Sequence, residues 1–77
     1  MKQLTYRILL NPEPEGGYTA TVPALPGCVT WGKDIDHAIE MTKEAIEIYI
    51  ESMVANNEKV PDESKTLEYA LTLNAVV

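Results

Sequence analysis

The chain has 77 residues, enough for one domain and too few for two. With 12 acidic and 6 basic residues its net charge is −6, so it cannot build the cationic surface that follows nucleic-acid phosphates, and a charged partner would be basic. A single cysteine, Cys28, excludes a disulfide framework within the chain. No apolar run approaches the ~20 residues that cross a bilayer. We therefore expect a cytoplasmic protein that does not enter the membrane.

The first part of the chain predicts three short antiparallel strands. Apolar and polar residues alternate over residues 3–10, which is the period of a half-buried strand. Residues 11–17 contain two prolines and two glycines and predict a hairpin loop. A second strand is predicted over residues 18–22, and a proline–glycine corner leads into a third strand over residues 28–31.

An amphipathic helix is predicted over residues 35–55. Its apolar face has helical spacing and comprises Ile35, Ala38, Ile39, Thr42, Ala45, Ile46, Tyr49 and Met53. Asp34 is placed to cap its N-terminus, and Asn56 and Asn57 can close it because asparagine tolerates the left-handed conformation. The apolar face is flanked by further apolar residues and is wider than packing on one small sheet needs: Met41, Ile48 and Ile50.

A last strand is predicted after the helix, beyond a polar connector over residues 58–65. Alternation over residues 66–74 places four large apolar residues on one side: Leu67, Tyr69, Leu71 and Leu73. The predicted fold is therefore α+β, with the order β-β-β-α-β in one domain over residues 1–77. A right-handed crossover gives a small mixed sheet that one helix covers on one face. The other face is bare, and because a bare apolar face on so small a domain invites a partner, we expect a homo-oligomer.

A specific motif joins the proline corner to the helix. It runs Val22-Pro23-Ala24-Leu25-Pro26-Gly27-Cys28 and continues with Trp31-Gly32, Ala38-Ile39 and Lys43-Glu44-Ala45-Ile46. In this motif the chain resembles the HicB-like antitoxin family. The resemblance implies a truncated ribonuclease-H-like sheet with one covering helix. It also implies a non-catalytic protein that caps a small basic RNA-cleaving toxin of the HicA type, often within an oligomer.

The resemblance has one departure. Many antitoxins of this family carry a C-terminal DNA-binding module, whereas this chain stops at Val77, directly after the predicted last strand. We therefore expect no direct binding to nucleic acid.

No catalytic constellation is evident, and we expect neither a cofactor nor a metal. Two-metal nuclease chemistry needs carboxylates that converge from the first strand, the helix and the last strand. The polar side of the first strand offers Thr5, Arg7 and Leu9, and none of these is acidic. His37 stands alone in the first helical turn and is interpreted as a surface residue, and Cys28 as a small residue packed at the corner.

Acidic side chains and one tryptophan are the candidates for partner binding. Four glutamates form a narrow stripe on the helix, opposite its apolar face: Glu40, Glu44, Glu47 and Glu51. Like charges four residues apart repel each other, and only Lys43 offsets them, so either solubility or a basic partner must explain the stripe. Glu13 and Glu15 in the hairpin loop extend the acidic surface. Trp31 is either a cap on the core at the sheet edge or an interface anchor.

Two functions follow from these features. The first is an antitoxin-type inhibitor that binds and occludes a small basic RNA-cleaving toxin, with acidic groups where RNA phosphates would otherwise lie. The alternative is a stand-alone oligomeric binding module with no toxin partner.

Overall fold

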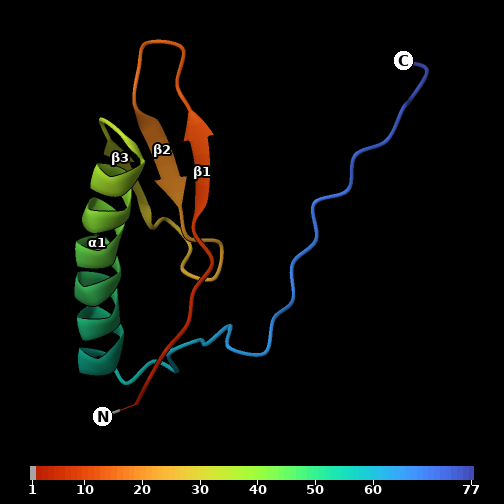
Figure 1. Ribbon diagram of the computed structural model, residues 1–77. Helices are drawn as coiled ribbons and strands as arrows, with labels where there is room; N and C mark the ends of the chain where they lie inside the picture. Colours follow the sequence, from red (N-terminus) through yellow and green to blue (C-terminus); the bar gives the residue numbers. More distant parts are fainter. Residues whose placement is uncertain (1) are drawn as a thin grey trace.

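The computed structural model describes residues 2–77 and shows a three-stranded antiparallel sheet with one long helix packed against it (Figure 1). The strands are β1 (Leu9–Pro12), β2 (Tyr18–Thr21) and β3 (Val29–Gly32), and they lie in the order β1-β2-β3. The helix is α1 (Ile35–Ala55). The predicted α+β class and the order β-β-β-α are confirmed. Across residues 2–77, no helix combines the length and the apolar character that crossing a bilayer requires.

The first strand lies closer to the hairpin than the prediction over residues 3–10. β1 pairs with β2 from Leu9, opposite Thr21, to Pro12, opposite Tyr18. A proline is tolerated there because β1 is an edge strand: the N–H of Glu13 donates to Gly17, so the alternate position Pro12 directs its backbone nitrogen to the outer edge and the ladder with β2 loses no donor. Residues 3–8 have no strand opposite them because β2 ends before the chain turns into the proline corner.

The proline corner between β2 and β3 supplies the centre of the core. Val22, Leu25 and Cys28 are buried there, and the backbone N–H of Val22 donates to the carbonyl of Cys28 at 3.0 Å. Partly buried apolar side chains pack around them, from the N-terminal segment and from α1: Tyr6, Ile8, Ala45, Ile46, Tyr49 and Met53. Burial raises the pKa of the Cys28 thiol, so this cysteine is the neutral packing residue that the sequence predicted.

The helix begins and ends where the sequence predicted, because both caps form. Asp34 Oδ1 accepts from the backbone N–H of His37 at 2.8 Å. At the other end Asn57 has a φ of 57°, and the N–H of Glu58 donates to the carbonyl of Met53 at 2.8 Å. This is the Schellman arrangement, with asparagine in the left-handed position.

The inner face of α1 is narrower than predicted. Ala38 and Thr42 are fully buried against the sheet. Ile35 and Ile39 remain 46% and 44% exposed, because a sheet of three four-residue strands covers only the centre of the apolar face.

The connector after α1 is tied to the N-terminal segment. The N–H of Glu63 donates to the carbonyl of Thr5 at 2.9 Å, and the N–H of Thr5 donates to Asp62 Oδ1 at 2.9 Å. Glu63 also accepts from the N–H of Arg7 at 2.9 Å and forms an ion pair with its guanidinium at 2.8 Å. These contacts fasten both ends of the folded part of the chain to each other.

The predicted last strand over residues 66–74 is corrected by the structure: within the described chain it pairs with no other strand. Residues after Thr66 extend away from the body on the far side of β1 from α1 (Figure 1). The apolar side chains predicted to be covered are exposed: Leu67, Tyr69, Leu71 and Leu73. The sheet is therefore antiparallel and not mixed. The physical reason is that α1 packs on β3 and β2, so no element among residues 2–77 covers a strand placed outside β1.

Candidate partner-binding surfaces

The strand register defines a bare sheet face on the side away from α1. Thr21 lies between Leu9 and Val29, and Thr19 lies opposite Trp31. Leu9, Val29 and Trp31 on this face are 42%, 54% and 51% exposed. The alternate positions face the helix, as Ala20 shows by being fully buried. We call the set Leu9, Asn11, Thr19, Thr21, Val29 and Trp31 the bare face, and none of its side chains is charged.

Trp31 belongs to the bare face and not to the core cluster. Its ring packs over Gly17, where an added Cβ would overlap the ring. Gly17 also has a φ of 79°, so both the backbone conformation and the space require glycine there. Of the two interpretations that the sequence left open, the core cap is the weaker. Binding of a partner by Trp31 stays a prediction.

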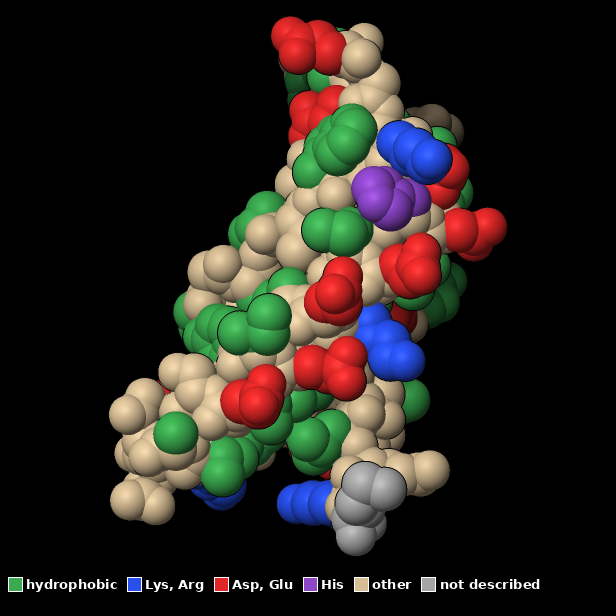
Figure 2. Space-filling model, turned by 90° about the vertical axis from the view of Figure 1, so that its left-hand side faces the viewer, with side chains coloured by type: hydrophobic (Ala, Val, Ile, Leu, Met, Phe, Trp, Pro, Cys, Tyr) green, Lys and Arg blue, Asp and Glu red, His purple; other side chains and the backbone are tan. Residues whose placement is uncertain are grey.

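The acidic helix residues lie together on the outer side of α1. Glu40, Glu44, Glu47 and Glu51 are all exposed. Figure 2 shows this side of the molecule, with carboxylate side chains in a band and basic side chains beside them at two places. We call these four residues the acidic stripe.

The hairpin acids form a second group. Glu13 and Glu15 lie at the tip of the β1–β2 hairpin, which reaches beyond the N-terminal end of α1 (Figure 1). The Glu13 carboxylate accepts a hydrogen bond from the Thr19 hydroxyl. The Glu13 carboxylate therefore already has a hydrogen-bond donor within the hairpin, and the Glu15 carboxylate is more available to a partner.

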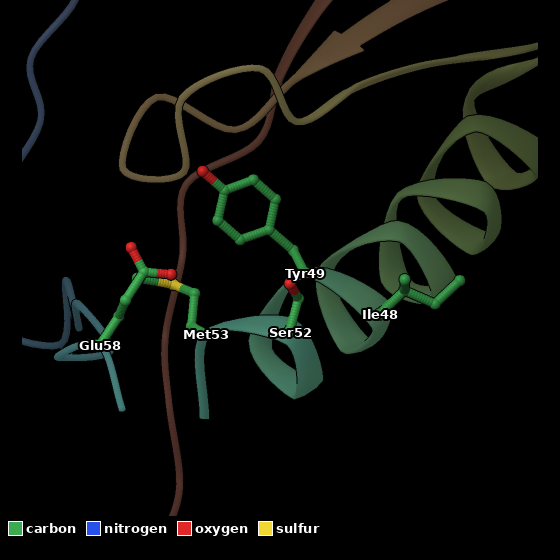
Figure 3. A pocket seen from close by; sticks show the side chains of 5 residues that line it. All are labelled: Ile48, Tyr49, Ser52, Met53 and Glu58. Carbon is green, nitrogen blue, oxygen red and sulfur yellow. The ribbon is translucent and has the colours of Figure 1, made fainter. Parts of the chain in front are cut away.

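Two shallow hollows lie on either side of Tyr49, on the C-terminal half of α1. The first has a volume of about 380 Å³ and is lined by Ile48, Tyr49, Ser52, Met53 and Glu58 (Figure 3). The second has a volume of about 300 Å³ and is lined by Gly27, Cys28, Val29, Ala45, Ile48 and Tyr49. The Tyr49 hydroxyl donates to the carbonyl of Pro26 at 2.7 Å and holds the ring between them. Ile48, 66% exposed, lines both hollows, and we call them together the Ile48 groove.

The Ile48 groove was missed by the sequence reasoning. Its lining comes from the proline corner, the helix and the residue after the helix cap, which only the fold brings together. The available signal was the excess width of the apolar helix face. Ile48 lies four residues after Glu44 and three before Glu51, spacings at which helical side chains are neighbours, so the groove adjoins the acidic stripe.

His37 has a local structural task. Its Nδ1 accepts from the backbone N–H of Lys33 at 3.0 Å, directly before the helix cap. Within residues 2–77, no three histidine, cysteine, aspartate or glutamate side chains come together as a group that could hold a metal ion.

Comparison with known proteins gives the family. The family described as the HicB_like antitoxin of bacterial toxin-antitoxin system matches residues 6–74. A UPF0150 protein of Thermoplasma acidophilum is 45% identical over 58 residues, which are 75% of this chain and 84% of that protein. A UPF0150 protein of Synechocystis is 47% identical over 58 residues, 75% of this chain and 73% of that protein. The chain belongs to the HicB-like antitoxin family, and the predicted resemblance is confirmed.

Two relatives carry the antitoxin name itself. Antitoxin HicB 1 of Photorhabdus laumondii is 34% identical over 79% of this chain, and antitoxin HicB of Escherichia coli is 31% identical over 75% of it. The matched part covers 39% and 42% of those two proteins.

Proposed function

We propose that this chain is an antitoxin that binds a small basic RNA-cleaving toxin of the HicA type and occludes it. The observation that carries the proposal is the position of the acidic stripe beside the exposed Ile48 groove, on a chain of the HicB-like family. A basic RNA-binding surface and this side of α1 are complementary in charge. The antitoxin then covers the surface that RNA phosphates would otherwise contact.

The two features have different tasks in the proposed complex. Exposed carboxylates attract a basic partner over a distance of about a Debye length, roughly 8 Å at physiological salt, and so raise the association rate. They contribute little to the dissociation rate, because exposed ion pairs remain hydrated. The apolar Ile48 groove holds the partner once it has arrived, since buried apolar contacts at the centre of an interface supply most of its free energy.

Inhibition by occlusion requires no catalysis by the antitoxin itself. We infer that the chain is not an enzyme and acts in the cytoplasm, where an RNA-cleaving toxin would meet its substrate. We also infer that residues 1–77 act as one domain without direct contact to nucleic acid, because the acidic charge of the chain repels phosphates. The likeness of its sheet to a truncated ribonuclease H stays a prediction. In the alternative, a binding module without a toxin, the acidic stripe would serve only to keep the protein soluble.

The experiment is co-expression with the product of the neighbouring reading frame. We expect the two proteins to co-purify, and the isolated partner to cleave RNA until this chain is added. Ile48→Asp should weaken the complex, whereas Val54→Asp, at a similarly exposed helix position of 60% that lines neither hollow, should not. A partner that cleaves RNA equally well with and without this chain would refute the proposal.

A further inference from the structure

Besides the Ile48 groove, the chain has two uncovered apolar surfaces. One is the bare face, and the other is the C-terminal segment over residues 66–74, in which Leu67, Tyr69, Leu71 and Leu73 are 94%, 87%, 69% and 73% exposed. The radius of gyration is 14.7 Å, against about 11.5 Å for a compact domain of this length. The isolated chain is therefore more extended than a compact domain of the same length.

The excess surface has the size of an interface. The accessible area is 6402 Å², against about 4,700 Å² for a compact monomer of this mass. The difference is about 1,700 Å² on one chain, or about 3,400 Å² over two copies, and obligate homodimer interfaces bury about 2,000–5,000 Å² in total. A second copy that buries an interface of this larger class is thus enough to cover what the chain leaves open.

The chain cannot cover the C-terminal segment by itself. The segment lies on the far side of β1 from α1, and α1 packs on β3 and β2 (Figure 1). A strand added to the outer edge of β1 within one molecule would thus remain largely beyond the helix. Its four large apolar side chains would stay exposed, so folding back gains little apolar burial.

The outer edge of β1 is nevertheless able to accept a strand. The N–H of Glu13 donates to the carbonyl of Gly17, which fixes the alternation of the ladder between β1 and β2. By that alternation Leu9 and Asn11 direct their backbone groups to β2, whereas Ile8 and Leu10 direct theirs to the outer edge. Within residues 2–77 no strand lies along this edge, and unpaired edge groups are a template for a strand from another chain.

We propose that the C-terminal segment of each molecule pairs with the outer edge of β1 in a second copy of this chain. The exchange is reciprocal, so the same edge and the same segment are used on both copies, as a two-fold interface requires. Each sheet gains its fourth strand from the partner. The apolar side of that strand and the bare face are buried together between the two copies.

The chemistry of these surfaces fits a second copy better than a basic toxin. The bare face carries no charge, and the segment carries one, Glu68. A basic partner finds only Glu68 to pair with there, and a nearly uncharged apolar surface suits an identical surface on a second copy. The acidic stripe lies on α1, away from this contact, so the repulsion between two chains of charge −6 is kept at a distance. The inference does not depend on the proposed toxin.

The test is the mass of the purified full chain in sedimentation equilibrium across the micromolar range. We expect the mass of two chains, each of 8.5 kDa. Leu71→Asp with Leu73→Asp should raise the dissociation constant by at least about 100-fold, because it places charges in an apolar contact. Both side chains are exposed in the single chain, so the variant keeps its fold and its helical circular dichroism. Leu9→Asp on the bare face, at a residue that lines neither hollow of the Ile48 groove, should have the same effect, whereas Met41→Asp on the helix should leave the dimer intact.

A second measurement identifies the pairing. In the dimer the amides of Ile8 and Leu10 should exchange slowly with solvent, and in the Leu71→Asp, Leu73→Asp variant they should exchange fast. A sample mixed from isotope-labelled and unlabelled chains should give contacts between residues 66–74 and β1 of different molecules.

A monomer with protected Ile8 and Leu10 amides would mean that the segment folds back on its own chain. A monomer that orders the segment only with the toxin would make the toxin its partner. A dimer that survives the paired leucine substitutions would place the interface elsewhere, and each of these three results overturns the proposal.

Discussion

The hydroxyl of Thr30 in β3 lies 2.9 Å from the hydroxyl of Thr42 in α1. The Thr42 hydroxyl already donates its hydrogen to the carbonyl of Ala38 at 2.6 Å, so Thr30 is the donor of the pair. This chain of two hydrogen bonds joins the sheet to the helix at a fully buried side chain. The direction of both bonds leads to a prediction about each hydroxyl.

Thr42→Val should lower the free energy of unfolding by about 1–2 kcal/mol, because the partly buried Thr30 hydroxyl loses its acceptor. Thr42→Ser keeps the hydroxyl and should cost less, through its missing methyl group alone. Urea denaturation of both variants checks this. Adding Thr30→Val to Thr42→Val should cost less than the sum of the single changes, and strict additivity would show that the two hydroxyls do not interact.

Gly32→Ala should destabilise the fold by about 1–3 kcal/mol or more, because overpacking forces the backbone to move. A Cβ at this position would overlap the backbone of Ala38 in the first turns of α1. Thermal unfolding measures the change. Lys33→Ala, at the next and exposed position, is the matched control, and equal melting temperatures for the two variants would contradict the close approach.

Stability should fall with pH below about 4.5 in a manner that depends on Glu63. The backbone N–H of Arg7 and its guanidinium hold the pKa of Glu63 below its ordinary value of 4.5, and the N–H of Thr5 with Ser64 holds the pKa of Asp62 below 3.8. A carboxyl group with a depressed pKa in the folded state stabilises the fold above its unfolded pKa, and this contribution is lost as the pH falls through its folded pKa. Glu63→Gln should flatten the melting temperature between pH 5 and pH 3, values that bracket the ordinary pKa. Glu68→Gln, on the exposed segment, should leave the slope unchanged.

Removal of charge from the acidic stripe should slow capture of the toxin without harming the fold. Glu44→Gln with Glu47→Gln should leave the melting temperature equal or higher, since repulsion between like charges on the helix is relieved. The association rate should fall, and its dependence on salt should weaken. Stopped-flow association with the toxin measures both. Glu13→Gln with Glu15→Gln is the comparison, and if neither pair changes the rate, electrostatic capture is refuted.

The purified chain alone should not cleave RNA in the presence of magnesium or manganese. Residues 3–12, which include β1, contain no carboxylate, and Arg7, the cation just before β1, is engaged with Glu63. A fluorogenic RNA substrate checks this. Metal-dependent cleavage that disappears when a carboxylate of this chain is changed to its amide would prove the protein to be an enzyme.

The helix could be predicted from the sequence to the residue, and the sheet only in outline. The ends of α1 depend on local signals, the Asp34 cap and the asparagine pair, which act within a few residues. The ends of β1 depend on where β2 stops, and the fate of residues 66–74 depends on which surface is open beside them. The Ile48 groove depends on Gly27 and Glu58 arriving at one place in the fold. Such long-range relations have no signature in a local pattern.

The position of Trp31 has a practical consequence. It is the one tryptophan in the chain, and it lies half exposed on the bare face. The intrinsic fluorescence of the protein therefore reports on that face. A molecule that covers the sheet should shift the emission to shorter wavelength, and one that docks on the outer side of α1 should leave it unchanged. A single titration followed by emission spectrum thus distinguishes occupancy of the two surfaces without any label.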